Sequence, residues 1–199
     1  MSVQVRTAAY PPQHKKMTDA EFFALCQSPE MRNKRIERHK NGKITIMEPT
    51  GGTTGSFNAE ISGEVRNWNK ETHSGRTFDS STGFTLPNSA IKSSDTAWVM
   101  RERWEALPKA LREKFPPLTP DFIIEIRSQS DSLTDLQEKM EEFMDNGCRL
   151  GWLIDRKKEC IYIYRADGSR ETVNSFEKTL LGEDVLVGFT LPIADLEWD

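Results

Sequence analysis

Residues 122–126, Phe-Ile-Ile-Glu-Ile, form a short and nearly continuous apolar segment. A run of this length and composition is typical of a strand buried inside a mixed or parallel sheet. Side chains alternate along a strand, so Glu125 shares a face with Ile123 and Arg127. A buried carboxylate is unfavourable unless it is paired, hydrogen-bonded or bound to a metal. We therefore expect Glu125 to have a partner in the fold.

Residues 133–144 follow this strand with apolar side chains at helical spacing, and Gly147 lies just past the end of the pattern. Lys139 lies three residues after Leu136 and four before Phe143, so its stem falls at the edge of the apolar stripe. Its ammonium can therefore reach back toward the sheet instead of into water. The strand carboxylate and the helix lysine together form a candidate site.

The remaining hydrophobic pattern predicts strands and helices around this unit. Thr18 and Glu21 have the spacing of a capping box, so we expect a short helix after Thr18. The dipeptide Asn41-Gly42 between two candidate strands is a strong hairpin signal. Apolar spacing predicts a helix over about 56–70 and a charged helical segment within 101–117. Further strands are expected at 44–47, 76–78, 83–86, 94–100, 150–155, 160–164, 171–173 and 191–193.

The glycine-rich segment 49–55, Pro-Thr-Gly-Gly-Thr-Thr-Gly, precedes the helix predicted at 56–70. A segment of this kind can bind phosphate through its backbone. This one lacks the Gly-Lys-Ser/Thr ending of a P-loop and the spacing of a dinucleotide-binding fingerprint. We therefore expect a plain loop that breaks the chain before the helix.

The order of these elements favours one α/β domain. The chain has 199 residues, which suits a single domain with a sizeable core. We expect the domain to span residues 17–199, with a central mixed sheet flanked by helices and a β-rich N-terminal extension. Residues 1–16 have the composition of a weakly ordered, flexible arm.

Composition narrows the class of protein. Hydrophobic residues make up 36% of the chain, with no apolar run long enough to span a bilayer and no apolar core of a signal peptide. We therefore expect no membrane association and a cytoplasmic location. Cys26, Cys148 and Cys160 are an odd number and lack metal-ligand spacing, so neither a disulfide framework nor a zinc site is expected. The net charge of -4 does not indicate nucleic-acid binding, although a local basic patch can oppose the average.

A second acid completes a candidate metal site. Asp95 starts the strand predicted at 94–100, and if this strand neighbours that of Glu125, the two carboxylates sit roughly 5 Å apart. Oxygen ligands of this kind suit Mg2+ or Mn2+ better than zinc. Such an ion would polarise a phosphoryl oxygen and supply hydroxide near neutral pH, while Lys139 orients the water or stabilises the transition state. An Asp, a Glu and a Lys are the minimum set for metal-assisted phosphodiester hydrolysis.

Several stretches together carry a resemblance to a known family. They are Ile36-Glu37, Gly42, Met-Glu-Pro-Thr at 47–50, Ser-Asp-Thr-Ala-Trp-Val at 94–99, Pro-Asp-Phe-Ile-Ile-Glu-Ile-Arg-Ser-Gln-Ser at 120–130, Asp-Leu-Gln-Glu-Lys at 135–139, Gly147 and Trp-Leu-Ile-Asp at 152–155. On these residues the chain resembles the Uma-two family of restriction endonucleases, within the PD-(D/E)xK, restriction-endonuclease-like superfamily. The resemblance covers most of the chain from about Met17 onward.

The resemblance implies a DNA endonuclease with a restriction-endonuclease-like fold. It implies that Asp95 and Glu125 bind the metal, Mg2+ or Mn2+, and that the catalytic lysine has moved from the strand to the next helix, which by position is Lys139. It also implies a homodimer, because nucleases of this kind commonly pair two sites to cut both strands of DNA.

The chain departs from the family pattern at three positions near these residues. Arg127 occupies the usual place of the motif lysine, and we consider it a candidate phosphate contact. Gln129 stands where the family usually has proline, and Ser94 replaces the proline before Asp95. Neither Gln129 nor Ser94 removes a catalytic group. Glu37, on an early strand, is a possible fourth acid.

The same residues also fit other roles. Glu125 could pair with Arg127 or another buried cation, Asp95 could cap a turn, and Lys139 could pair with Asp135 at i,i+4 helical spacing. These pairings would suit a catalytically silent module that binds nucleic acid or a protein. They would also suit a structural protein in which the acids and the lysine form a buried salt-bridge network. Metal binding that vanishes in Glu125→Gln would separate a nuclease from both.

Overall fold

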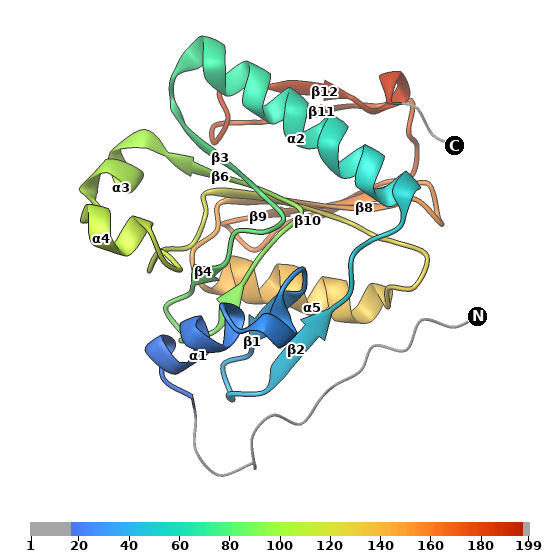
Figure 1. The fold of residues 1–199 in the computed structure, drawn as a ribbon. Coiled ribbons are helices and arrows are strands. Elements are labelled where there is room, and N and C mark those ends of the chain that lie inside the picture. The colour runs from blue at the N-terminus through green and yellow to red at the C-terminus, as the bar shows by residue number, and fades with distance from the viewer. Residues whose placement is uncertain (1–16, 197–199) are drawn as a thin grey trace.

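The computed structural model describes residues 17–196 and is built on a six-stranded mixed sheet (Figure 1). In this part of the chain the strand order is β10-β9-β8-β7-β6-β3. Strands β7 and β8 are parallel, and the other neighbouring pairs are antiparallel. The strands are β3 (Gly75–Asp79), β6 (Thr96–Met100), β7 (Phe122–Ile126), β8 (Leu150–Asp155), β9 (Cys160–Arg165) and β10 (Arg170–Val173). The flexible arm expected at residues 1–16 lies outside the described residues.

Two helices cover opposite faces of this sheet, α2 (Gly52–Thr72) above it and α5 (Leu133–Asp145) below it in Figure 1. Because side chains alternate along β7, Ile124 packs in the core cluster that contains the apolar side chains of α2, whereas Ile123 packs with those of α5. Glu125 lies two residues after Ile123, so its side chain is on the same face of β7. The alternation thus directs its carboxylate toward α5, the helix that carries the predicted lysine.

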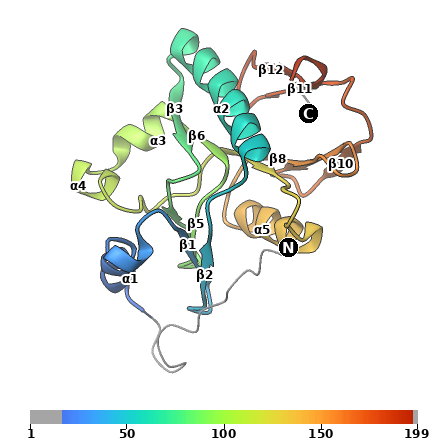
Figure 2. The same ribbon diagram turned by 45° about the vertical axis from the view of Figure 1, so that its right-hand side comes forward.

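A smaller sheet, with strand order β2-β1-β5-β4 in the described part of the chain, lies beside the first (Figure 2). Its strands are β1 (Arg35–Arg38), β2 (Ile44–Met47), β4 (Phe84–Thr85) and β5 (Ile91–Lys92). Strands β1 and β2 form the hairpin predicted from Asn41-Gly42, and Gly42 has a φ of 87°, which glycine adopts without strain. The chain passes directly from β5 into β6, so Asp95 lies where the two sheets meet.

The remaining elements flank the two sheets. Helix α1 (Asp19–Cys26) begins with the predicted capping box of Thr18 and Glu21. The charged segment expected within 101–117 contains helices α3 (Arg101–Ala106) and α4 (Lys109–Arg112). The other elements are the short 3-10 helices η1 (Pro29–Met31) and η2 (Ile193–Asp195) and the strand pair β11 (Thr179–Leu181) and β12 (Thr190–Pro192).

Helix α2 begins earlier than its apolar spacing indicates. The expectation of a plain loop over 49–55 is wrong for its second half, because the helix starts at Gly52 with Gly51 as its N-cap. Glycine in a helix costs about 1 kcal/mol relative to alanine. Burial of Phe57, Ile61 and Val65 one to three turns later offsets this cost, so tertiary packing outweighs local propensity.

The aromatic and sulfur side chains of the sheet are mostly packing residues. Trp98 and Trp152 are buried in one core cluster, as expected. Cys148 and Cys160 are buried and Cys26 is partly exposed, and all three are free thiols. Burial raises the pKa of the Cys148 thiol to about 12, so this side chain is a poor nucleophile at neutral pH.

Candidate active site

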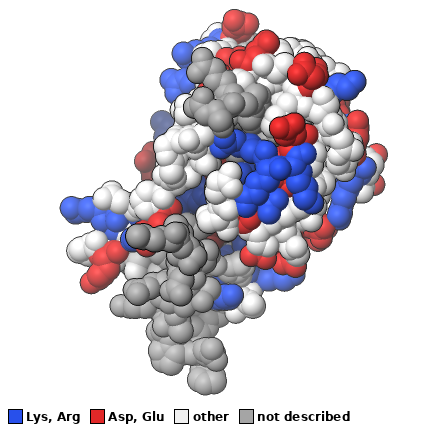
Figure 3. Space-filling model, turned by 90° about the vertical axis from the view of Figure 1, so that its right-hand side faces the viewer, with Lys and Arg blue, Asp and Glu red and all other residues white. Residues whose placement is uncertain are grey.

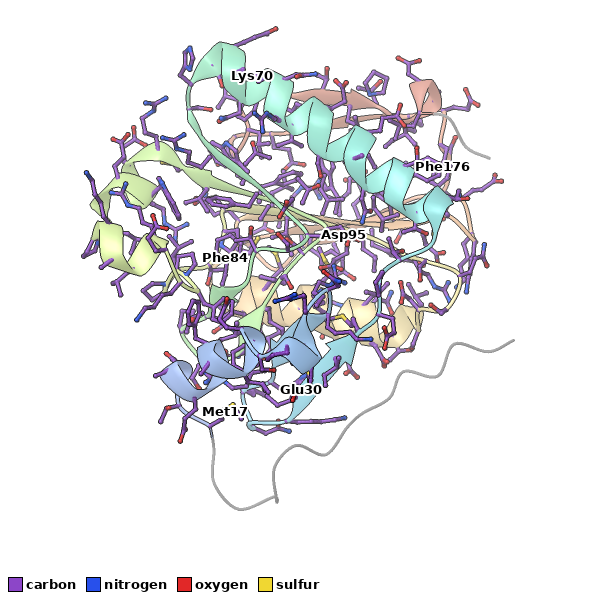
Figure 4. The ribbon with its side chains drawn as sticks, viewed as in Figure 1. Met17, Glu30, Lys70, Phe84, Asp95 and Phe176 are labelled. Atoms are coloured by element: carbon purple, nitrogen blue, oxygen red, sulfur yellow. The ribbon has the colours of Figure 1, made fainter. Side chains whose placement is uncertain are left out.

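Asp95 and Glu125 come from neighbouring strands and lie at the same level of the sheet. The antiparallel register of β6 and β7 pairs Thr96 with Ile124, so Asp95, one residue earlier, falls opposite Glu125, one residue later. Both are buried, with 6% of Asp95 and 1% of Glu125 exposed. Figure 4 labels Asp95 near the middle of the molecule, between the large sheet and the β1–β2 hairpin. The arrangement of strands that we expected for these two acids is therefore present.

Each oxygen of Asp95 accepts one hydrogen bond. The backbone N–H of Ile126 donates to Oδ2 at 2.8 Å, and Nη1 of Arg35 donates to Oδ1 at 3.1 Å. Burial alone would lower the pKa of Arg35, but the carboxylates of Asp95, Glu125 and Glu37 raise it. Arg35, on a strand of the smaller sheet, is therefore a fixed positive charge beside Asp95, just before the start of β6.

Lys139 joins Glu125 to another acid, Glu37. Its Nζ lies 2.8 Å from Oε1 of Glu125 and 3.0 Å from Oε1 of Glu37, and only 10% of its side chain is exposed. Glu37 is on β1, two residues after Arg35, so both side chains leave the same face of that strand. The helix lysine, the acid on β7 and the acid on β1 thus meet in one buried cluster.

The cluster extends away from β7 through Lys92. Nζ of Lys92 lies 3.3 Å from Oε2 of Glu37 and 3.3 Å from Oε2 of Glu142. It also lies 3.2 Å from Nδ1 of His39, whose Nε2 is 2.7 Å from the Thr45 hydroxyl. A protonated lysine can only donate, so it fixes His39 as the acceptor at Nδ1 and the donor at Nε2. Glu37 therefore lies between two buried ammonium groups.

The two glutamates have opposite pKa shifts. Burial, with a smaller contribution from Asp95, raises the pKa of Glu125 to about 7 against the pull of Lys139. Burial acts in the same direction on Glu37, but Lys139, Lys92 and Arg35 together lower its pKa to about 2. Burial would lower the pKa of Lys139, yet Glu125 and Glu37 raise it, so the ammonium stays charged. At neutral pH, Glu125 is the acid of this cluster that is poised between its two protonation states.

Arg127 has a different partner from the one considered above. Its Nη1 donates to Oδ2 of the fully buried Asp155 at 2.8 Å, and its Nε donates to the carbonyl of Asp131 at 3.2 Å. Arg127 is therefore not the partner of Glu125, which instead pairs with another buried cation, Lys139, at 2.8 Å. Arg127 is held at the end of β7, next to the acidic pair but directed to β8.

The structure brings together Asp95, Glu125, Lys139 and the possible fourth acid Glu37. It leaves Arg127 out of this cluster and adds Arg35 and Lys92, which sequence reasoning missed. A signal for Arg35 was present, because it alternates with Glu37 along a predicted strand. Lys92 had no comparable signal, since its contacts depend on how the smaller sheet folds back onto α5.

The oxygen atoms of this cluster suit a hard divalent cation in part. Oε1 of Glu125 is buried and lies 2.8 Å from Nζ of Lys139. A carboxylate oxygen has two lone pairs, so this atom keeps one that a cation could use beside the ammonium. Within residues 17–196 no group of three or more His, Cys, Asp or Glu side chains has a metal-binding arrangement. Asp95 and Glu125 would supply two ligands, and a carbonyl, water or phosphate oxygen would have to supply the rest.

The family comparison identifies the chain. The model of the Uma-two family, described as "Putative restriction endonuclease", matches residues 19–194. The chain belongs to the Uma-two family.

No curated protein matches the chain. Within the described residues, no helix combines the length and the hydropathy of a membrane span.

A solved structure supports the fold of this Uma-two member. The crystal structure of a "putative nuclease belonging to DUF820" from Anabaena variabilis matches with a TM-score of 0.70 and 21% sequence identity. The match covers 89% of this chain and 96% of that chain. The expected fold class, a central mixed sheet flanked by helices with a nuclease-like architecture, is thereby confirmed.

Proposed function

We propose that this Uma-two protein is a divalent-metal-dependent endonuclease that hydrolyses phosphodiester bonds in DNA. Membership of a restriction-endonuclease family and a nuclease-like fold support the reaction class. The observation that carries the proposal is the convergence of Asp95, Glu125 and Lys139 from three separate elements into one buried cluster. A cluster of charged groups in a protein interior is costly to maintain, which favours a functional reason for it.

In this proposal Asp95 and Glu125 hold Mg2+ or Mn2+. Oε1 of Glu125, beside the Lys139 ammonium, and both oxygens of Asp95, beside the hydrogen bonds that they accept, each keep a lone pair for the ion. All donors are oxygens, which suits these ions better than zinc. When bound, the cation would polarise a phosphoryl oxygen and lower the pKa of a water molecule.

Lys139 acts as a charged hydrogen-bond donor and not as a general base. Two carboxylates raise its pKa, so its Nζ has no lone pair to accept a proton at neutral pH. A fixed ammonium next to the acidic pair can orient the attacking water and stabilise the negative charge that develops on the phosphate oxygens. Glu37 keeps the ammonium near the site when Glu125 is engaged elsewhere, because its Oε1 lies 3.0 Å from Nζ.

Nucleases of this kind commonly cut both strands of a duplex by pairing two such centres. The described residues contain one Asp95–Glu125–Lys139 cluster, so we propose that two copies of the chain pair to make a double-strand break. Sedimentation of the protein with and without a DNA duplex tests this part of the proposal. A monomer that linearises plasmid in a single encounter would contradict it.

One observation favours a different function. Every acid of the cluster already has a cationic neighbour, since Arg35 faces Asp95, Lys139 faces Glu125 and Lys92 faces Glu37. A protein of purely structural or binding function could keep this network as a buried set of salt bridges. In that case Glu125→Gln would change stability, and no preparation would bind Mn2+ or cut DNA.

Plasmid nicking separates these functions. Purified wild type is incubated with supercoiled plasmid and either Mg2+, Mn2+ or EDTA, beside Asp95→Asn and the exposed control Asp184→Asn. The proposal predicts nicking by wild type and the control in either metal, and none by Asp95→Asn or in EDTA. Normal nicking by Asp95→Asn with an intact fold would overturn the metal-site assignment.

A further inference from the structure

A group of basic side chains lies at the same end of the sheet as the candidate active site. The turn between β8 and β9 has three consecutive basic residues, Arg156, Lys157 and Lys158, and Arg127 follows the end of the neighbouring strand β7. We call these four residues the basic strip. The three turn residues belong neither to the cluster of Asp95, Glu125, Lys139 and Glu37 nor to the proposed catalytic step.

The register of the sheet fixes the distance from the strip to the acids. Strands β7 and β8 are parallel, and Glu125 is paired with Leu153. The turn therefore begins three residues beyond the level of Glu125, which is about 10 Å at 3.3 Å per residue. Consecutive phosphates on one strand of B-DNA rise about 3.4 Å along the helix axis, so a duplex lying along β8 would place the strip roughly three nucleotides from the acids.

The strip is held in place by contacts with the fold. The Lys157 ammonium donates to the carbonyl of Gln129 at 2.6 Å, which ties the turn to the loop after β7. The guanidinium of Arg156 lies 4.0 Å from the ring centroid of Phe57 on α2. Arg127 is anchored by Asp155 at 2.8 Å. Cations with fixed positions lose less entropy when they bind phosphate than freely moving ones do.

Charge at this end of the sheet differs from that of the whole chain. The chain has a net charge of -4, yet Figure 3 shows lysine and arginine side chains gathered in the middle of the face at which β8 ends. Asp155, the acid that precedes the turn, is fully buried and offsets the charge of Arg127, so the outward positive charge comes from the three turn residues. One exposed acid, Glu159, closes the turn. A polyanion is therefore attracted to this face and repelled by the average surface.

We propose that the basic strip binds the phosphate backbone of duplex DNA about three nucleotides from the bond to be cut, and so directs the duplex onto the acids. The inference rests on the proposed nuclease function and extends it to a contact surface. The chemistry of the strip recognises phosphate and carries no base readout, so the contact is independent of sequence.

The test measures DNA binding without cleavage. A fluorescein-labelled duplex is titrated with full-length protein in EDTA at several salt concentrations, and plasmid nicking is scored on the same preparations. The strip variant is Lys157→Glu/Lys158→Glu, and Lys157→Arg/Lys158→Arg keeps the charge. The control variant, Lys109→Glu/Lys114→Glu, makes the same charge change at exposed residues on and just after α4, on the opposite side of Figure 1.

The strip variant is expected to bind at least tenfold more weakly than wild type at low salt. Its plot of log affinity against log salt should be flatter by about two units, since two phosphate contacts are lost. The arginine variant should bind like wild type, and the control should stay within about twofold after correction for net charge. Circular dichroism checks that each variant is folded.

Other outcomes separate failure of the strip from failure of the nuclease proposal. Wild-type affinity in the strip variant, or equal losses in strip and control variants, would overturn the strip while leaving cleavage by wild type intact. A wild type that neither binds nor nicks DNA would overturn both proposals. Tighter binding of an RNA duplex of the same sequence would overturn the choice of DNA.

Discussion

Oε1 of Glu37 lies 3.0 Å from Nζ of Lys139, across the boundary between the smaller sheet and helix α5. The contact connects the N-terminal hairpin, which carries neither Asp95 nor Glu125, to the lysine that faces Glu125. The two contacts of β1 fix the position of the hairpin against α5 and the start of β6. Arg35 pairs with Asp95 and Glu37 pairs with Lys139, both from the same face of β1. The β-rich extension is therefore part of the candidate site.

Replacing Glu37 by Gln should slow nicking about 10- to 100-fold, the range typical of residues that position metal-site groups. The variant removes the second anchor of Lys139 and leaves Lys92 without one of its two carboxylates. Stability should fall by less than the roughly 3 kcal/mol expected for a fully unpaired buried charge, because Lys139 keeps Glu125 and Lys92 keeps Glu142. Glu48→Gln, at an exposed ion pair just after β2, is the control and should change neither quantity appreciably. An unchanged nicking rate in folded Glu37→Gln would remove Glu37 from the site.

Glu125 should make the metal-free protein less stable as the pH rises. Its pKa is about 7 in the folded chain against an ordinary value of 4.5. Between these values the folded state holds a proton that the unfolded state has lost, so the stabilisation is complete below about pH 4.5 and is lost as the pH passes through 7. The loss is about 3 kcal/mol. Urea denaturation in EDTA at pH 5 and pH 8 should show this fall in wild type and not in Glu125→Gln, and parallel profiles would contradict the shift.

The same proton should compete with the metal. Below pH 7 a cation must displace the proton of Glu125, so the affinity for Mn2+ should fall by up to tenfold per pH unit. Calorimetry at pH 6 in two buffers of different ionisation enthalpy should show nearly one proton released for each ion bound, and close to none at pH 8. An affinity that does not change between pH 6 and pH 8 would exclude Glu125 as a ligand that must lose a proton.

Asp155 should matter more for stability than a surface acid does. It is fully buried and its Oδ2 accepts from Arg127 at 2.8 Å, so Asp155→Ala leaves a guanidinium without its anchor and should cost about 3 kcal/mol. The matched control is Glu141→Ala, which breaks the exposed pair with Arg170 and should cost about 0.5 kcal/mol or less. Urea denaturation measures both, and similar costs for the two variants would show that the buried pair is not a structural anchor.

The sequence predicts the part of the site that is local in the chain. Glu125 lies on the face of β7 that also carries Ile123. Lys139 lies three residues after Leu136 and four before Phe143, on the inner edge of α5. These two positions are enough to direct both side chains into the space between β7 and α5. The Arg35–Asp95 contact joins residues 60 positions apart, and no periodicity reports how the two sheets meet. The early start of α2 at Gly52 was missed for a related reason, since packing in the core decides it and glycine propensity opposes it.

The metal centre is best tested by calorimetric titration with Mn2+ at pH 8 of wild type and Glu125→Gln, with plasmid nicking scored on the same preparations. We expect wild type to bind Mn2+ and nick plasmid, and the variant, folded by circular dichroism, to lose both. Binding and nicking that persist in Glu125→Gln, or a wild type that shows neither, would contradict a metal centre at Asp95 and Glu125.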